Sequence, residues 1–285
     1  MSPRVQLAVA AVLFSTGGAA IKWVSLPGWQ VAGARAAIAL VAMVTLIPGA
    51  RHGWSWRTAV VGCGYAATTL LYVLANKLTT AANAIFLQAT NPLFILVLAP
   101  WLLGERVSRR DVAYMAVLGI GLLLFFVGVE RRFATAPDPL LGNLLATCSA
   151  LTWALTVIGY RWLSAREGGS GGPVAAAAAS GSLIAFLVAL PWALPLHGGR
   201  ATDWLVLLYL GVFQLGLAYV FITRAVPRVS ALDVSLLMLI EPVLNPLWAW
   251  WLHGETPRLA ALAGAGVILS TTVVRSWPGA GARRG

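Results

Sequence analysis

Polar side chains within long apolar runs are the residues of this sequence that could do chemistry. The run at 231–253 carries Met238, Glu241, Asn245 and Trp248 at spacings of three and four residues, which places them on one face of a helix. A polar group buried in lipid is costly and is often retained for a function. We expect this face to line a site for a small molecule, where Glu241 would bind a substrate ammonium group or carry a coupling proton.

A matching polar set lies about 150 residues earlier in the chain. It comprises Gln88, Asn91 and Pro92. Pro92 lacks the N–H that would bond to the carbonyl of Gln88, and Pro242 and Pro246 leave two further carbonyls free in the later run. We expect these three prolines to act as hinges and the polar side chains to line the site; the alternative is polar contact between packed helices.

Aromatic residues supply the expected walls of the cavity. Tyr72, Trp153 and Tyr219 lie within other apolar runs, and such walls suit a small neutral or zwitterionic solute with an apolar part. Ordinary helix packing is the alternative. Arg35 lies inside the second run, where it could meet a substrate carboxylate, neutralise Glu241 or extend to the interface; we favour a structural role. We assign no role to His253.

The composition indicates a membrane protein. Of the 285 residues, 59% are hydrophobic and 10% are charged, whereas a soluble domain has about 25% charged residues. The apolar runs are too long and too uniform for barrel strands, so they predict an all-α protein with ten transmembrane helices. The runs are approximately 5–24, 31–50, 58–78, 81–103, 111–129, 140–163, 174–196, 204–225, 231–253 and 258–275.

Basic residues predict the orientation of these spans. The formal net charge is +11, but the cations are scattered at the ends of apolar runs, which is typical of membrane loops rather than of a nucleic-acid surface. With the N-terminus in the cytoplasm, thirteen Lys and Arg face inside and six face outside. This bias predicts that both termini are cytoplasmic. The six outside residues are Lys22, Lys77, Arg131, Arg132, Arg200 and Arg258.

An internal repeat divides the chain. Residues 75–118 align without a gap on residues 225–268, and the two segments share aligned prolines and a Trp-Leu-x-Gly-Glu ending. The repeat predicts two units of five spans, 1–135 and 136–285. Because five is odd, the second unit must enter the membrane from the opposite side. Inverted repeats are typical of transporters, where they surround a central cavity at mid-membrane.

No catalytic, cofactor or metal motif accompanies the spans. The three histidines lie at span ends or in loops, and no HExxH motif or pair of acids occupies the span interiors. Cys63 and Cys148 have no CxxC or Cys/His spacing, so we expect small buried side chains rather than a disulfide or a zinc site. We therefore predict no catalytic residue, cofactor or metal. An intramembrane enzyme and a channel remain as alternatives to a carrier.

The repeat resembles the drug/metabolite transporter superfamily, in the ten-span branch named for its duplicated EamA domain. The carrying segments are ALTWALTVIGYRWL, TTAANAIFLQATNPLFILVLAPWLLGERVSRRD and VSALDVSLLMLIEPVLNPLWAWWLHGE. Within the branch, the sequence is similar to bacterial exporters of aromatic amino acids. The resemblance implies export of amino acids and related metabolites across the bacterial inner membrane by alternating access. Export of other small metabolites or cationic drugs is the alternative.

Overall fold

Helices make up the described part of the chain. The computed structural model describes residues 1–103, 109–124, 135–166, 171–196, 198–225, 237–238, 240–256 and 259–276. In lipid, a helix pairs the backbone N–H and C=O groups that water would otherwise satisfy. The helices up to residue 124 are α1 (Pro3–Ser15), α2 (Gly17–Trp23), α3 (Gly28–Leu46), η1 (Pro48–Ala50), α4 (Trp56–Leu78), α5 (Ala81–Gln88), α6 (Asn91–Leu103) and α7 (Arg109–Leu124). The later helices are α8 (Pro139–Arg166), α9 (Gly172–Ala193), α10 (Ala201–Tyr209), the π-helical η2 (Leu210–Leu217), α11 (Ala218–Ala225), α13 (Ile240–His253) and α14 (Leu259–Ser276).

Several helical segments are long and apolar enough to cross a membrane. Among the described residues these six are Pro3–Trp23, Gly28–Leu46, Trp56–Leu78, Pro139–Ser164, Gly172–Ala193 and Ala201–Ala225. Shorter apolar helices cover Val112–Leu124 and Leu262–Thr271. The expectation of an all-helical chain with multiple membrane spans agrees with these segments. The count of ten spans stays a prediction, and part of the ninth range lies outside the described residues.

Among the described residues, three of the predicted spans are irregular in their interior. The first is interrupted at Thr16, whose hydroxyl donates to the carbonyl of Leu13 at 2.7 Å. The fourth is interrupted at Ala89 and Thr90, between α5 and α6. The eighth contains the π-helical stretch η2, where Gly211 packs tightly against α3. The sequence analysis expected bends at prolines and did not foresee the first or the third of these irregularities.

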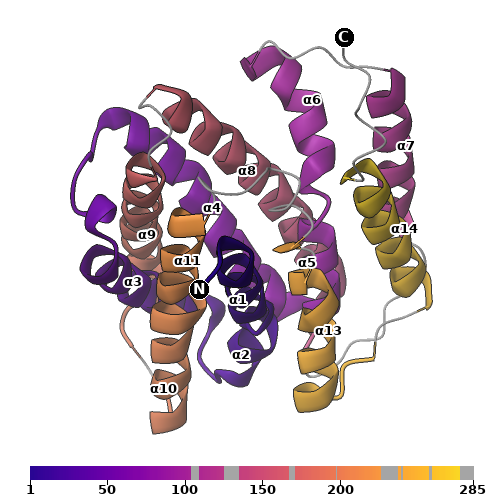
Figure 1. The fold of residues 1–285 in the computed structure, drawn as a ribbon. Helices are drawn as coiled ribbons and strands as arrows, with labels where there is room; N and C mark the ends of the chain where they lie inside the picture. Colours follow the sequence, from indigo (N-terminus) through magenta and orange to yellow (C-terminus); the bar gives the residue numbers. More distant parts are fainter. Residues whose placement is uncertain are drawn as a thin grey trace.

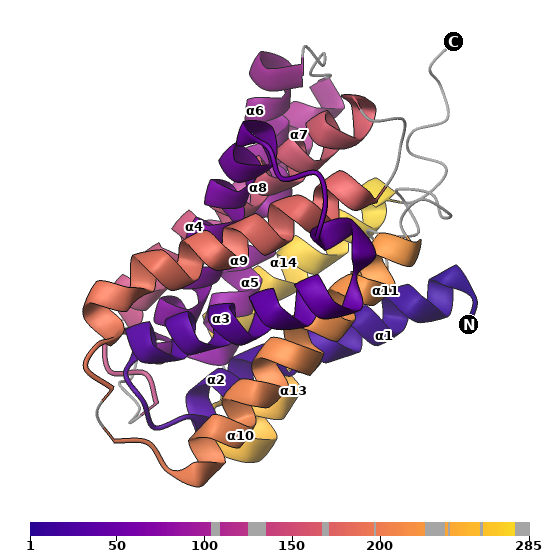
Figure 2. The same cartoon turned by 90° about the vertical axis from the view of Figure 1, so that its left-hand side faces the viewer.

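The main helix contacts join the earlier part of the chain to the later part. α4 packs against α8 and α9, α3 against α9 and η2, and α7 against α14. α1 packs against α11 and α13, whereas α5 and α6 pack against α8. Figure 1 shows α3 beside α9 on one side of the molecule and α7 beside α14 on the other, and Figure 2 again places α3 beside α9. Helices from the two predicted units are thus interleaved.

Small residues allow this close packing. The α9 segment Ala175–Ala179 is buried, and a Cβ added at Gly181 would lie 2.6 Å from the carbonyl oxygen of Gly62 on α4. Between membrane helices, close approach through small residues replaces the hydrophobic effect as a source of attraction. The expectation that Cys63 and Cys148 are buried is wrong, because both residues are exposed.

Candidate functional site

A buried guanidinium group lies between α3 and η2. Arg35 is 4% exposed, and its Nη2 donates to Oε1 of Gln214 at 2.7 Å. The Gln214 amide also donates to the backbone carbonyl of Phe14 at 3.4 Å. The expectation that Arg35 could extend to the interface is wrong, since its side chain is enclosed and joins three helical elements.

Two glycines at the start of α2 let amide side chains approach the backbone. A Cβ added at Gly17 would lie 2.8 Å from Nε2 of Gln214, and one added at Gly18 would lie 2.6 Å from Oδ1 of Asn245. A larger residue at either position would have to displace the neighbouring amide. The interruption of the first span therefore meets polar side chains from η2 and from α13.

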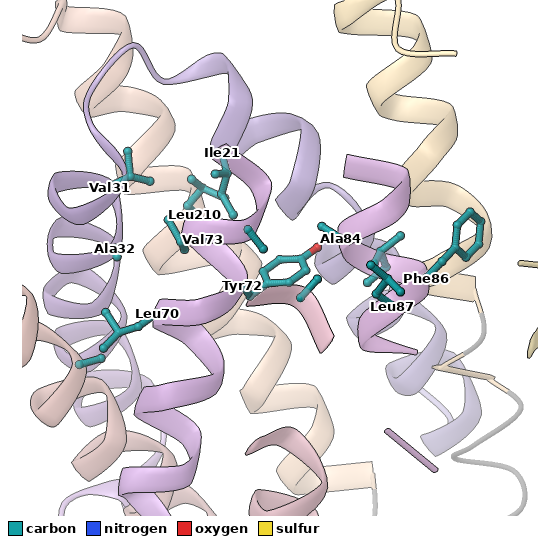
Figure 3. Packing of buried hydrophobic residues seen from close by; sticks show 14 of the residues in the cluster. Ile21, Val31, Ala32, Leu70, Tyr72, Val73, Ala84, Phe86, Leu87 and Leu210 are labelled. Atoms are coloured by element: carbon teal, nitrogen blue, oxygen red, sulfur yellow. The ribbon is translucent and has the colours of Figure 1, made fainter. Parts of the chain in front are cut away.

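Tyr72 and Asn245 form a direct contact between α4 and α13. The Asn245 Nδ2 donates to the Tyr72 hydroxyl at 3.2 Å, and both residues are buried. Tyr72 points from α4 toward the helix that carries Ala84 and Leu87 (Figure 3). Glu241 lies one turn before Asn245 on α13 and is half-buried.

Aromatic side chains gather beside this polar group. The ring of Tyr219 stands edge-on to Tyr65 at 5.8 Å and to Phe14 at 6.0 Å. Its hydroxyl lies 3.5 Å from that of Tyr160, which packs edge-on against Trp153 at 6.4 Å. Trp153 and Tyr219 therefore belong to one aromatic cluster at the α4, α8 and α11 junction, in geometries that aromatic rings favour.

The side-chain amides of Gln88 and Asn91 form hydrogen bonds within the protein. Gln88 Nε2 donates to the hydroxyl of Ser149 at 2.9 Å, and Ser149 donates to the carbonyl of Thr68 at 3.2 Å. Asn91 Nδ2 donates to the carbonyl of Gln88 at 3.2 Å, which is the carbonyl that Pro92 leaves without an N–H partner. The Gln88 contact links α5 to α8, and the Asn91 contact spans the interruption between α5 and α6.

The remaining candidates lie on or just before α13. Trp248 Nε1 donates to the Ser15 hydroxyl at 3.0 Å, at the end of α1. Pro242 and Pro246 both lie within α13, which continues past them to His253. Met238 is half-buried.

A small cavity adjoins the arginine. Its volume is about 10 Å³, room for about one water molecule. Its polar lining comes from Arg35, Tyr65, Thr69 and Ser182. These residues belong to α3, α4 and α9, so the cavity lies where helices of both predicted units meet. In this conformation it is far smaller than the few hundred Å³ of a usual ligand pocket.

A buried ion pair closes one end of the bundle. Lys22 Nζ lies 2.8 Å from Oε1 of Glu255, and each side chain is 1% exposed. The same ammonium group donates to the carbonyls of Thr79 and Thr135, while Oε2 of Glu255 accepts from the Ala81 N–H at 2.8 Å. Glu255 therefore caps α5 and pairs with Lys22.

His253, to which we assigned no role from the sequence, also lies at this closed end. Its Nε2 lies 2.8 Å from the carbonyl oxygen of Ala19, and its ring packs against Trp23 at 6.1 Å. The contact ties the end of α13 to α2. Both helices lie in the lower part of Figure 1.

Comparisons with known proteins show which family and which solved structure share this architecture. The EamA-like transporter family matches residues 4–127 and 140–277. The chain belongs to the EamA-like transporter family. A solved crystal structure, 21% identical, aligns over 95% of each chain with a TM-score of 0.62, which shows a shared fold.

Curated relatives of this EamA-family chain include named transporters. The pseudopaline exporter CntI of Pseudomonas aeruginosa is 28% identical over 68% of this chain and 66% of its own length. The alignment thus spans just under two thirds of that exporter. An uncharacterized transporter of Clostridium kluyveri is 26% identical over 74% of this chain and 70% of its own length. An uncharacterized protein of Pseudomonas aeruginosa is 33% identical over 80% of this chain and 76% of its own length. The family and relative names indicate a transporter rather than an enzyme.

The EamA fold brings together only part of the predicted site. Tyr72 and Asn245 form a hydrogen bond, and Glu241 lies one turn before Asn245 on the same helix. Trp153 and Tyr219 join the aromatic cluster, whereas the Gln88 amide bonds to α8. Tyr65, Thr69 and Ser182 line the cavity with Arg35 but were not predicted as site residues. Their hydroxyls carry no signal in a single sequence, because such residues are common in membrane helices.

Proposed function

We propose that this protein is a secondary carrier that exports neutral amino acids, aromatic ones included, and related metabolites by alternating access. It would lie in the bacterial inner membrane with both termini in the cytoplasm. The observation that carries the proposal is the polar group around Arg35 and Asn245, enclosed between helices of the two predicted units and closed at one end by a buried ion pair. Carriers bind their substrates at such mid-membrane positions.

The packing of the helices supports a ten-span inverted repeat. With the spans numbered one to ten as above, α4 on α8 joins spans three and six, and α1 on α11 joins eight and one. Likewise α3 on η2 joins two and eight, and α4 on α9 joins seven and three. The pairs α7–α14 and α3–α9 join spans five with ten and two with seven. Adding five to each span number, and subtracting ten where the sum exceeds ten, gives the same set of contacts. A pseudo-two-fold axis between the two units requires this equivalence.

The buried ion pair supports alternating access, with this structure in a conformation closed toward the outside. Lys22 and Glu255 lie in segments that the distribution of basic residues places outside, and their side chains exclude water from that end. Opening toward the outside would break this pair and separate α2 from α13. The interruptions at Thr16 and at Ala89–Thr90 provide places where the first and fourth spans could bend, and the hinges predicted at Pro92, Pro242 and Pro246 would act beside them.

Counterflow of labelled amino acids into proteoliposomes that contain only this protein tests the proposal. Threonine, methionine, phenylalanine and tryptophan would be compared. Saturable uptake accelerated by unlabelled substrate inside is expected for a carrier, whereas a channel shows no such acceleration. Absence of uptake for all four, in vesicles with folded protein, would overturn the amino-acid proposal. The second candidate, export of another small metabolite, is favoured by the name of the pseudopaline exporter, and that class would be tested next.

Glu241→Gln tests proton coupling within this proposal. We expect the variant to keep exchange of substrate and to lose flux driven by a pH gradient, because glutamine has the same shape but carries no proton between states. Both fluxes would be measured in the same vesicles. Asp138→Asn, at a loop position outside the predicted site, serves as the matched control. Loss of both fluxes would instead make Glu241 a substrate ligand, and loss of neither would make it structural.

A further inference from the structure

Arg35 is a buried cation whose hydrogen-bonding capacity is largely unused. Its guanidinium group has five N–H donors. Nη2 bonds to Gln214, but Nε has no hydrogen-bond partner in the described part of the chain. No carboxylate among the described residues lies within ion-pair distance of it. A buried charge without a counter-ion is strongly unfavourable, so this position is suited to an anion that is supplied from elsewhere.

The cavity beside Arg35 offers further donors to such an anion. The Tyr65 hydroxyl makes no well-formed hydrogen bond in the described residues, although it lies near the hydroxyls of Ser182 and Tyr219. The Ser182 hydroxyl contacts the sulfur of Met43 at 3.9 Å, and a thioether is a weak acceptor. Thr69 differs, because its hydroxyl donates to backbone carbonyls of α4. Three groups around one cavity therefore have donors to offer, and a carboxylate is a group that only accepts.

The packing of α4 against α9 holds these donors in position. A Cβ added at Gly181 would lie 2.6 Å from Cδ1 of Tyr65, and one added at Gly62 would lie 2.5 Å from the hydroxyl oxygen of Ser180. This contact leaves the Tyr65 ring little freedom to turn away. Gln214 holds the guanidinium group through its hydrogen bond to Nη2. Each side chain is thus held against its neighbours before a ligand arrives, which lowers the entropy cost of ordering it on binding.

We infer that the Arg35, Tyr65 and Ser182 cluster binds the carboxylate of the transported molecule. The inference rests on the proposed carrier function and narrows its substrates to carboxylates, among them amino acids. The cavity has room for about one water molecule in this conformation, so α3 must move relative to α4 or α9 to admit the carboxylate.

Competition between carboxylates and their amides tests the inference. Counterflow of the best-transported labelled amino acid would be inhibited by unlabelled phenylalanine or by phenylalaninamide, which differ at the carboxyl group. We expect the acid to compete at least about tenfold better, as for a charged hydrogen bond. Equal competition by the two compounds, with transport intact, would overturn the inference and leave the carrier function standing.

Substitutions in the cluster test whether the preference for the acid over the amide arises there. Arg35→Gln should raise the half-saturation concentration for the acid at least about tenfold and abolish the preference over the amide. Arg35→Lys should restore part of the preference, because it keeps the charge but loses the planar fork. Tyr65→Phe should raise the half-saturation concentration for the acid about fivefold. Arg51→Gln, at an arginine that bonds to carbonyls near an exposed helix end, is the matched control. A preference that survives Arg35→Gln contradicts the inference.

Binding to purified protein separates this inference from the transport proposal. Phenylacetate and phenylacetamide would be compared for their effect on the thermal unfolding midpoint in detergent, in the wild type and in Arg35→Gln. We expect phenylacetate alone to raise the midpoint, and only in the wild type. Protection of this kind without transport of any amino acid would overturn the proposed substrates but support the anion site. Absence of protection in folded wild-type protein would count against the anion site itself.

Discussion

Lys22 at the closed end and Arg35 beside the cavity are both buried cations, but their surroundings differ. The ammonium group of Lys22 has three protons, and the structure gives it a carboxylate and two backbone carbonyls. Arg35 has five donors and a single hydrogen bond to a neutral amide in the described residues. A polar network whose donors are all paired stabilises one structure. A network with unpaired donors keeps the capacity to bind a ligand.

The position along each helix explains this difference. Lys22 and Glu255 lie at helix ends, where backbone groups have no partner within their own helix. Thr79 caps the end of α4 and Ala81 begins α5, so both offer backbone groups to the ion pair. Arg35 lies inside α3, and the surrounding backbone groups are already used. Only side chains or a ligand can satisfy a charge at that depth.

The largest effect is expected from breaking the closed end. Glu255→Gln keeps the size of the side chain but leaves Lys22 without its counter-ion, and removing one partner of a buried pair costs about 3–5 kcal/mol. The thermal unfolding midpoint in detergent measures this loss. The double variant Lys22→Met with Glu255→Leu should recover most of it, because no charge is left unpaired. A midpoint for Glu255→Gln equal to that of the wild type would show that the pair does not hold the end closed.

A smaller effect is expected where the interrupted first span meets the site. Gly18→Ala places a Cβ 2.6 Å from Oδ1 of Asn245, and overpacking of this kind costs about 1–3 kcal/mol. Gly266→Ala in α14 is the matched control, because nothing lies within 4 Å of its added Cβ. That variant should gain about 0.5–1 kcal/mol from helix propensity. Equal unfolding midpoints for the two variants would contradict the close packing of α2 on α13.

The smallest effect is expected at the neutral contact between α4 and α13. Tyr72→Phe removes the hydroxyl that accepts from Asn245, and a typical hydrogen bond contributes about 0.5–1.5 kcal/mol. A double-mutant cycle with Asn245→Leu, followed by thermal unfolding, isolates the coupling between the two side chains. Additive effects would mean that the two side chains do not interact in solution.

Parts of the site were predictable and parts were not. Helical spacing grouped Glu241 with Asn245, because residues four apart share a helix face. The cap at Thr80, whose side chain accepts from the Asn83 N–H at 3.2 Å, also follows from local sequence. Helical spacing does not indicate which other helix that face meets. The pairing of Asn245 with Tyr72 and the capture of Arg35 by Gln214 therefore required the three-dimensional structure.

The sequence by itself determined that this chain is helical and apolar enough to span a membrane several times. The physical reason is that lipid offers no hydrogen bonds, so long apolar runs have little choice but to form helices. Only the tertiary structure decided which polar groups are satisfied. Lys22 and Glu255 lie far apart in the chain and meet because helix ends converge, whereas Arg35 keeps unused donors because α3, α4 and α9 enclose it.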